Sequence, residues 1–286
     1  MVGMHPNNTY QGSYDFKALL KLTPELQEHI VINPRGQQTI TFSNPDSVKL
    51  LNKALLKSYY GISYWDVPDG YLVPPIPSRS DYIHHVAELI SKKDNITMLD
   101  IGTGANLIYP IVAISAYGWT VVGSDIDQTA LSNAQDIIDQ NESLQGNCTL
   151  SYQPNREHIL TGIIQSDDYF DLVVCNPPFH ASAAHASKAA ARKRKNLKYK
   201  KGNKKLNFGG TSNELWSPGG EASFIKTMIH QTKDHSGKCG WCTSLVSSHR
   251  LLESLEQLLL KLHAVEIRII DMQHGNKTTQ ILCWRF

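Results

Sequence analysis

Residues 171–179 read Asp-Leu-Val-Val-Cys-Asn-Pro-Pro-Phe, and the rest of the chain is organised around this stretch. The apolar run 172–175 predicts a short buried strand. Two prolines follow, which lack a backbone N–H and keep the preceding residues extended, so Asn176 and Pro177 leave the strand with free carbonyl groups. These acceptors, followed by the ring of Phe179, suit an amine on a flat ring. A Pro-Pro turn with a packed phenylalanine is the alternative interpretation.

The segments on both sides of this stretch alternate between strands and helices. Apolar strands are expected at Ile96–Ile101, Trp119–Ser124, Cys148–Tyr152, His158–Ile164 and Lys238–Val246. Helices are expected at Asp81–Ser91, Leu107–Tyr117, Asp127–Asn141, Glu221–Thr232 and Arg250–Leu262. Val265–Asp271 and Thr279–Phe286 predict a terminal antiparallel pair around a Gly275-Asn276 turn. The pattern indicates an α/β fold with a doubly wound, mostly parallel sheet and an antiparallel edge.

Residues 1–75 are expected to be an N-terminal extension, and residues 76–286 the main domain. The extension contains a short helical pattern that begins at Phe16 and a turn at 33–36. Further signals predict a helix start capped by Thr23, a short strand Ile40–Phe42, a helix capped by Asp46, and an ordered loop Tyr59–Pro77.

Composition limits the class of protein. The 286 residues suffice for one large α/β domain with an extension, and 41% hydrophobic and 19% charged residues are globular values. No apolar run reaches 18 residues, so we expect no membrane span. The N-terminus lacks a signal-peptide pattern, so we expect a cytoplasmic protein. Five thinly spread cysteines, an odd number, argue against a disulfide framework.

Basic charge is concentrated in one segment. Lys188–Lys205 holds ten of the 28 basic residues, and no acid occurs from Leu172 to Asn213. The rest of the chain carries 18 basic against 26 acidic side chains, a net charge of −8. A polyanion is therefore the expected partner of this segment, with a solvated charge run as the alternative. The absence of a hydrophobic period and the presence of Gly202 predict a loop.

A glycine turn indicates a nucleoside-containing cofactor. Residues 98–104 read Met-Leu-Asp-Ile-Gly-Thr-Gly, and Asp125 follows about 20 residues later, where an acid can accept from ribose hydroxyls. The third glycine of a dinucleotide fingerprint is replaced by Leu107, and Asp100 beside the turn suits a cation better than a phosphate. The residues thus favour S-adenosylmethionine, which has an ammonium, a sulfonium and no phosphate. A dinucleotide site and an unliganded turn remain alternatives.

Longer blocks of sequence carry a family resemblance. They are Met4–Pro6, Pro77–His84, Asp100–Pro110, Cys175–His180, Leu206–Gly210, Gly219–Glu221 and Thr243–Ser247. With these blocks the chain resembles, over nearly its whole length, the RlmF family of bacterial 23S ribosomal RNA adenine-N6-methyltransferases, which is related to the eukaryotic U6 RNA adenine methyltransferase. The resemblance implies a seven-stranded Rossmann-like methyltransferase sheet. It also implies methyl transfer from S-adenosylmethionine to the N6 amine of one adenine in 23S rRNA, with S-adenosylhomocysteine as product.

The resemblance also implies roles for single residues. The Asn176 side-chain oxygen and the Pro177 carbonyl would accept the two N6 hydrogens of a flipped-out adenine, with Pro178 completing the turn and Phe179 stacking on the base. The cofactor would be held by Arg79, Asp100, Gly102, Thr103, Gly104, Asn106 and Asp125. RNA would be bound by Lys188, Arg192, Lys193, Arg194, Lys195 and Lys198.

The sequence also bears on the substrate, on metal binding and on alternative functions. The expected substrate is 23S rRNA or a large-subunit assembly intermediate. We expect the protein to be a monomer that binds no metal. Cys239 and Cys242 match a redox or metal spacing, but strand residues three apart face opposite ways and no second pair exists. The alternatives are a non-catalytic RNA-binding assembly factor and a protein-glutamine methyltransferase. The intact Asn176–Phe179 stretch and glycine turn argue against the first, and the second gives no reason for the lysine-rich segment.

Overall fold

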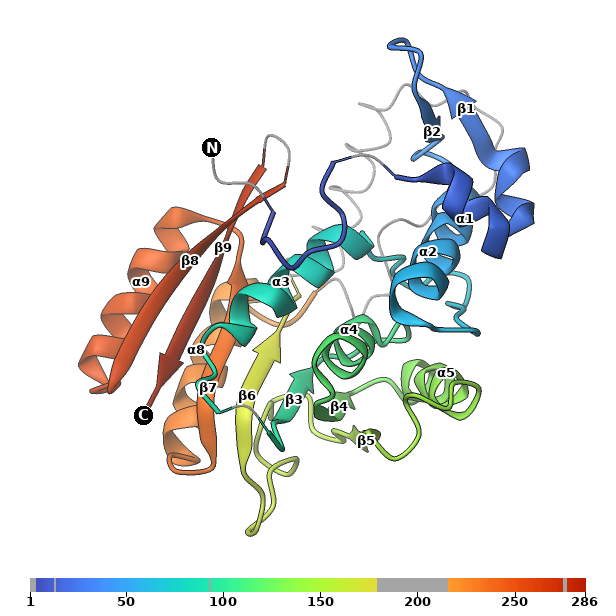
Figure 1. Ribbon diagram of the computed structural model, residues 1–286. Helices are drawn as coiled ribbons and strands as arrows, with labels where there is room; N and C mark the ends of the chain where they lie inside the picture. The colour runs from blue at the N-terminus through green and yellow to red at the C-terminus, as the bar shows by residue number, and fades with distance from the viewer. Residues whose placement is uncertain (1–3, 13, 93, 179–215, 275–276) are drawn as a thin grey trace.

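The computed structural model describes residues 4–12, 14–92, 94–178, 216–274 and 277–286 (Figure 1). The described helices are α1 (Phe16–Leu22), the 3₁₀ helix η1 (Pro24–His29), α2 (Pro45–Tyr60), α3 (Ile76–Ala87), α4 (Ile108–Tyr117), α5 (Gln128–Asp139), α8 (Gly220–Asp234) and α9 (His249–Lys261). The described strands are β1 (Ile30–Ile32), β2 (Gln38–Ile40), β3 (Thr97–Ile101), β4 (Thr120–Asp125), β5 (Cys148–Tyr152), β6 (Phe170–Cys175), β7 (Cys239–Val246), β8 (Glu266–His274) and β9 (Lys277–Arg285). None of these helices is long and apolar enough to cross a bilayer.

The described strands of the main sheet number seven, in the order β5-β4-β3-β6-β7-β9-β8. β3 pairs in parallel with β4 and with β6, whereas β9 pairs antiparallel with β7 and β8. Ile101 at the end of β3 lies opposite Cys175 at the end of β6. The predicted sheet and its antiparallel C-terminal edge are confirmed. The glycine turn and Asn176 therefore leave the sheet at the same edge.

Alternating side chains bury the two faces of the sheet in separate clusters. On β3, Met98 packs in the cluster that also contains side chains of α3, α4 and α5, and Leu99 packs in the cluster of α8 and α9. On β6, Leu172 and Val173 divide in the same way. Figure 1 shows α8 and α9 on one side of the sheet and α3, α4 and α5 on the other. This two-sided burial explains the continuous apolar runs of the central strands.

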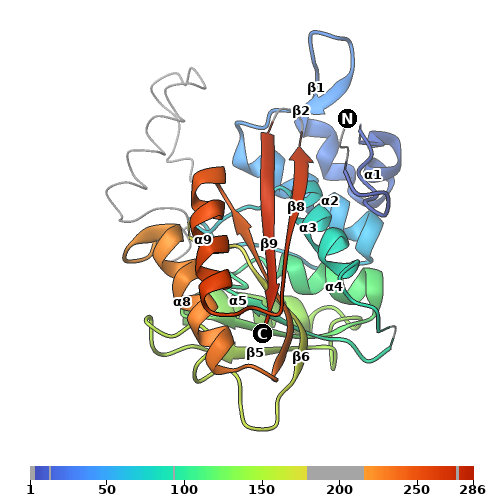
Figure 2. The same cartoon turned by 90° about the vertical axis from the view of Figure 1, so that its left-hand side faces the viewer.

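The N-terminal extension adds to the first cluster. Leu51 and Leu55 of α2 are fully buried together with Ile111 of α4. The antiparallel hairpin β1–β2 projects from this part of the molecule, as Figure 2 shows at the top of the view. Trp65 Nε1 donates to the Asn106 carbonyl at 2.8 Å. The segment before α3 is therefore fastened to the residues that follow the glycine turn.

Several predicted boundaries are wrong for identifiable reasons. Asn44, not Asp46, caps α2: its side chain accepts the Asp46 N–H at 3.0 Å, and Pro45 occupies the first turn. The Thr23 side chain makes no cap bond to η1. The short strand is Gln38–Ile40, not Ile40–Phe42, because it pairs with β1 across the turn at residues 33–36.

The predictions for the start of α3 and for residues 158–164 are also wrong. α3 begins at Ile76, not Asp81, because Pro77 lies in the first turn, where no N–H is needed. His158–Ile164 is not a strand. The N–H groups of Ile159, Leu160 and Thr161 all donate to the Gln231 side chain, and only an isolated bridge joins Thr161 to Ile164.

The expectation that Cys239 and Cys242 point to opposite faces is also wrong. Both pack in the cluster of α8 and α9, and a hydrogen bond to Cys242 lowers the pKa of Cys239. The backbones of β6 and β7 approach closely near the start of β7: a Cβ placed on Gly240 would lie 2.4 Å from the Asp171 carbonyl oxygen. The close approach of β6 and β7 at this point therefore requires glycine.

Candidate active site

Two glycines shape the turn after β3. Gly102 and Gly104 have φ angles of 73° and 64°, the left-handed conformation that glycine adopts without strain. The N–H groups of Gly102 and Thr103 donate to the Ser124 carbonyl at 2.8 and 3.0 Å, which ties the turn to β4. The turn therefore presents backbone at the carboxyl edge of the sheet, where open α/β sheets bind ligands.

Asp125, the last residue of β4, is fixed against this turn. Its Oδ2 accepts the Gly104 N–H at 2.9 Å, and its Oδ1 accepts the Asp127 N–H at 2.9 Å. Burial raises the pKa of Asp125, and the two backbone N–H groups partly offset this by favouring the charged form. The carboxyl group is thus held in one orientation at the predicted ribose position.

Asp100 lies on β3 behind the turn. Its side chain is fully buried, and neither carboxyl oxygen has a hydrogen-bond partner among the described residues. Burial raises the pKa of Asp100 from 3.8 to about 7. Thr103 Oγ1, in the turn itself, is likewise buried and lacks a partner within the described chain. Unpaired buried polar groups are costly, so these atoms fit a ligand that brings donors or positive charge.

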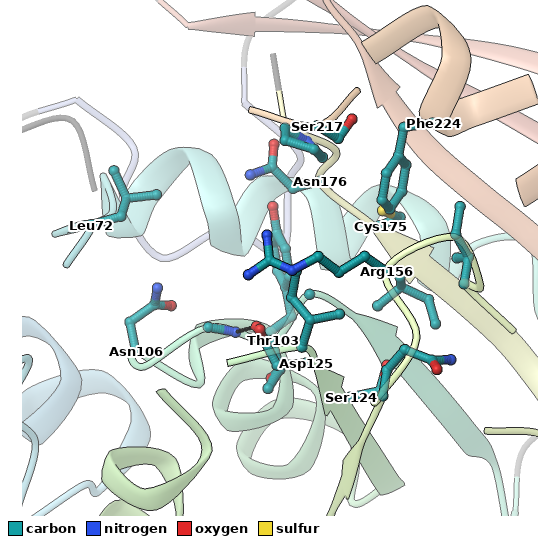
Figure 3. Close-up of a pocket in the computed structure, with 18 of the residues that line it drawn as sticks. Leu72, Thr103, Asn106, Ser124, Asp125, Arg156, Cys175, Asn176, Ser217 and Phe224 are labelled. Carbon is teal, nitrogen blue, oxygen red and sulfur yellow. Dashed lines mark hydrogen bonds between the residues drawn. The ribbon is translucent and has the colours of Figure 1, made fainter. Parts of the chain in front are cut away.

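Asn176 follows directly on β6. Its Oδ1 is buried and has no hydrogen-bond partner in the part of the chain that the structure describes. Figure 3 shows the amide across the pocket from Thr103 and Asp125. Pro178 lines the same pocket, whereas Pro177 is buried and does not. Phe179 lies outside the described residues, so its stacking role stays a prediction.

The glycine turn, Asp125 and Asn176 line one cavity of about 220 Å³. The predicted site residues in its wall are Arg79, Gly102, Thr103, Gly104, Asn106, Asp125, Asn176 and Pro178. Asp100 is absent from the wall because it lies beneath the turn. The predicted RNA-binding residues, Lys188, Arg192, Lys193, Arg194, Lys195 and Lys198, lie outside the described residues. The structure thus brings together residues from three strand ends, at Ile101, Asp125 and Cys175, which span about 75 positions in sequence.

Arg79 enters the pocket from α3 and is held by Tyr109 of α4. Arg79 Nη1 donates to the Tyr109 hydroxyl at 2.9 Å, and the guanidinium carbon lies 5.8 Å from the ring centroid. Burial raises the pKa of Tyr109 to about 12, so the hydroxyl is neutral and its oxygen can accept. The arrangement fixes a permanent cation at the pocket wall, which suits a carboxylate ligand.

Part of the wall was not anticipated from the sequence. The loop after β5 contributes Gln153, Arg156, His158 and Ile159. Figure 3 shows the Arg156 side chain crossing the pocket between Asn176 and Asp125. No spacing or composition signal marks these residues, because they reach the cavity through the tertiary fold alone.

The extension supplies a further part of the wall, through Leu72 and Pro74. Asn52 of α2 donates to the Pro74 carbonyl at 2.8 Å, which fixes the loop before α3. The prolines and aromatics of the segment 59–77 signalled an ordered loop, and the structure shows that its last part borders the cavity.

Comparison with known proteins places the chain in a class. All 286 residues match the model of a family described as RNA methyltransferase, and the chain belongs to this family. It is 45% identical to ribosomal RNA large subunit methyltransferase F of Vibrio cholerae, covering 99% of this chain and 83% of that protein. It is 46% identical to the protein of the same name from Bacteroides thetaiotaomicron, covering 99% and 97%. The resemblance inferred from the sequence blocks is confirmed.

Solved structures show the same fold. The catalytic domain of hMettl16 in complex with a MAT2A 3′UTR hairpin superposes with a TM-score of 0.84 at 28% identity, covering 100% of this chain and 98% of that one. The N-terminal domain of human METTL16 in complex with SAH has a TM-score of 0.79 at 24% identity, covering 100% and 99%. The predicted Rossmann-like methyltransferase sheet is confirmed.

Proposed function

We propose that the protein transfers a methyl group from S-adenosylmethionine to the N6 amine of an adenine in 23S ribosomal RNA. The family supports RNA methylation, and the names of relatives about 45% identical support the large ribosomal subunit as the source of the substrate. One observation favours an amine as acceptor: Asn176, whose Oδ1 is buried and unpartnered among the described residues, lines the same cavity as the glycine turn. An acceptor oxygen placed there needs an N–H donor from the substrate.

The residues around the cavity fit S-adenosylmethionine. The glycine turn and Asp125 suit its ribose, and Arg79 suits its carboxylate. The unpaired oxygens of Asp100 suit its positive charge, and Thr103 and Asn106 add polar groups to the wall. A METTL16 domain solved in complex with SAH, the demethylated cofactor, has the same fold. The bound cofactor would supply an electrophilic methyl group on sulfur.

The chain then needs to position the amine and to exclude water. The Asn176 Oδ1 and the Pro177 carbonyl would accept the two N6 hydrogens, which turns the nitrogen lone pair toward the cofactor. Because Pro177 does not line the cavity in this structure, the base would have to expose its carbonyl on binding. No strong general base is required, because the leaving group is a neutral thioether and the proton can depart after attack. Catalysis is therefore mainly positioning and desolvation.

RNA binding is assigned to the basic segment Lys188–Lys205 and to the extension 1–75. The segment begins nine residues after Phe179, so phosphates would be neutralised near the flipped base. The substrate would be 23S rRNA or an assembly intermediate, met in the cytoplasm by a monomer. A protein-glutamine methyltransferase would share the Asn176 geometry, but the RNA methyltransferase family favours RNA.

The direct test is incubation of the protein with tritiated S-adenosylmethionine and 23S rRNA, large-subunit assembly intermediates, or ribosomal proteins. We expect label in rRNA, and mass spectrometry of digested nucleosides should identify N6-methyladenosine. Label at N1 or C2 of adenine, on another base, or on protein would contradict the proposal. A loss of labelling between 50 and 200 mM salt would support phosphate contacts in binding.

A further prediction concerns Gln231, which holds the loop after β5. Its Oε1 accepts the N–H groups of Ile159, Leu160 and Thr161 at 2.9, 2.8 and 3.1 Å. Gln231→Leu leaves these groups unpaired, so the wall formed by Ile159 should loosen. We expect the Kd for S-adenosylmethionine, measured by calorimetry, to rise about tenfold. Gln231→Glu keeps the acceptor and should bind within about twofold of wild type, and equal loss in both variants would contradict this role.

A further inference from the structure

β6 and β7 separate just before Asn176. Their parallel pairing includes Leu172 opposite Trp241 and Val173 opposite Cys242. No pair is formed beyond this point among the described residues, although β6 continues to Cys175. On its other side, β6 stays paired with β3 to its last residue. The end of β6 that carries Asn176 is thus supported by strand pairing on one side only.

The hydroxyl of Tyr82 occupies the opening between these strands. Tyr82 lies on α3, is fully buried, and accepts the Cys175 N–H at 3.3 Å. Its oxygen lies 2.7 Å from Thr243 Oγ1 on β7, and Thr243 Oγ1 donates to the Val173 carbonyl at 3.0 Å. Thr243 is also fully buried. Two side-chain hydroxyls therefore take the place of the missing backbone pairing.

The hydroxyl protons of Tyr82 and Thr243 can be assigned so that each hydrogen bond has one donor and one acceptor. Thr243 has a single hydroxyl proton, which is used on Val173, so its oxygen accepts from the Tyr82 hydroxyl. The Tyr82 oxygen then accepts from the Cys175 N–H. The contact from the Tyr82 hydroxyl to the Cys175 carbonyl, at 3.4 Å, is the longer alternative for the same proton. Every buried polar group is satisfied only when both hydroxyls are present.

α3 itself is held in place from the N-terminal side. Asp81, next to Tyr82 on the helix, is fully buried and accepts the His5 N–H at 2.8 Å and the Asn8 side-chain amide at 2.9 Å. The Tyr82 ring also packs edge-on against Tyr109, with centroids 5.2 Å apart, and Tyr109 holds Arg79. The Tyr82 ring thus supports Tyr109, which holds Arg79, and the Tyr82 hydroxyl supports the end of β6 that carries Asn176.

We propose that the hydroxyls of Tyr82 and Thr243 are positioning groups for the methyl-transfer step, which link the end of β6 to β7 at a fixed spacing and set the direction in which Asn176 leaves the strand. The inference rests on the proposed role of Asn176 as the acceptor of the substrate amine. Neither Tyr82 nor Thr243 lines the cavity, so Tyr82 acts through the Cys175 N–H, and Thr243 acts through Tyr82 and the Val173 carbonyl.

Steady-state kinetics test the proposal. Tyr82→Phe keeps the ring beside Tyr109 but leaves the Cys175 N–H unpaired, so kcat should fall about tenfold or more, and the KM for S-adenosylmethionine should change less than about twofold. Thr243→Val should have the same effect, and Thr243→Ser, which keeps the hydroxyl, should restore kcat. A folded Tyr82→Phe protein with kcat within twofold of wild type would overturn the proposal, as would Thr243→Ser as slow as Thr243→Val.

A second readout does not depend on activity. In NMR hydrogen exchange, the Cys175 amide should exchange at least tenfold faster in Tyr82→Phe than in wild type, because its acceptor is lost. Unchanged exchange would refute the proposed contact. Tyr60→Phe is the matched control: its hydroxyl bonds Ser80 on the same helix at 2.6 Å and is also buried, so kcat should stay near wild type. A similar fall in the control would indicate a general effect on α3 and would overturn the specific role.

The same experiments separate this inference from the proposed function. If Asn176→Ala methylates normally, the acceptor role fails whatever Tyr82 does. If Asn176→Ala is inactive and the Tyr82 and Thr243 variants are fully active, the acceptor role stands and the positioning role is rejected.

Discussion

Asn176→Ala should reduce kcat about 10³-fold and leave the affinities for S-adenosylmethionine and RNA within about threefold of wild type. The change removes a buried side-chain oxygen that has no partner among the described residues, on a residue that lines the pocket. Loss of a single preorganised hydrogen-bonding group in an active site costs about 10²–10³ in kcat, and an adenine that is free to rotate also loses its alignment. Single-turnover methylation with tritiated cofactor measures the chemical step, and calorimetry measures cofactor binding.

Two further variants make this result specific. Asn176→Asp keeps one acceptor oxygen on a charged group, so activity should lie between those of alanine and wild type. Asn147→Ala changes an exposed asparagine in the loop before β5 and should have no effect. Full activity in Asn176→Ala would exclude the acceptor role. A large loss of cofactor affinity in the same variant would instead assign Asn176 to the cofactor side of the pocket.

The strands and the site motifs could be predicted because their signals are local. The apolar runs that end at Ile101 and Cys175 are buried on both faces, and glycine or proline ends each of them. Adjacent parallel strands finish at one edge, so two motifs about 70 residues apart could be placed in one pocket from sequence alone. The structure agrees with this placement.

The missed features depend on contacts made across the fold. The apolar residues of 158–164 look like a strand, but Gln231 from α8 takes their N–H groups and makes a loop. Arg156 reaches the cavity only because that loop is held there. The start of α3 was missed because Pro75 and Pro77 were assigned to the preceding loop, although proline fits the first helical turn. Tertiary hydrogen bonds of this kind leave no periodic signal.

Asp100→Asn should stabilise the cofactor-free protein at neutral and alkaline pH. The pKa of Asp100 is raised from 3.8 to about 7 because its carboxyl is fully buried, and the Thr103 hydroxyl and the Arg79 charge offset only part of this effect. The folded state therefore resists ionisation, while the unfolded chain ionises near pH 4. Relative to the variant, wild-type stability should fall as the pH rises from about 4 to about 7 and then stay level. A difference of about three pKa units corresponds to at most about 4 kcal/mol.

The same substitution should weaken cofactor binding. An ionised Asp100 beneath the glycine turn attracts the positive charge of S-adenosylmethionine, whereas an asparagine does not. A hydrogen bond or contact to a charged group contributes about 1.5–3 kcal/mol, so the Kd measured by calorimetry at pH 8 should rise about ten- to a hundredfold. Stability and binding would then change in opposite directions, as expected for a strained acid that is retained for its ligand.

Urea unfolding of wild type and Asp100→Asn between pH 4 and pH 9 isolates the effect, because all other titrating groups are common to both proteins. Asp136→Asn, an exposed acid on α5, serves as the control and should change neither the pH dependence nor the Kd. If Asp100→Asn and wild type show the same pH dependence, then Asp100 is not held as a strained acid in the folded protein. If the variant is more stable but binds the cofactor normally, the buried charge serves the turn and not the ligand, and the assignment of Asp100 to the cofactor site must be abandoned.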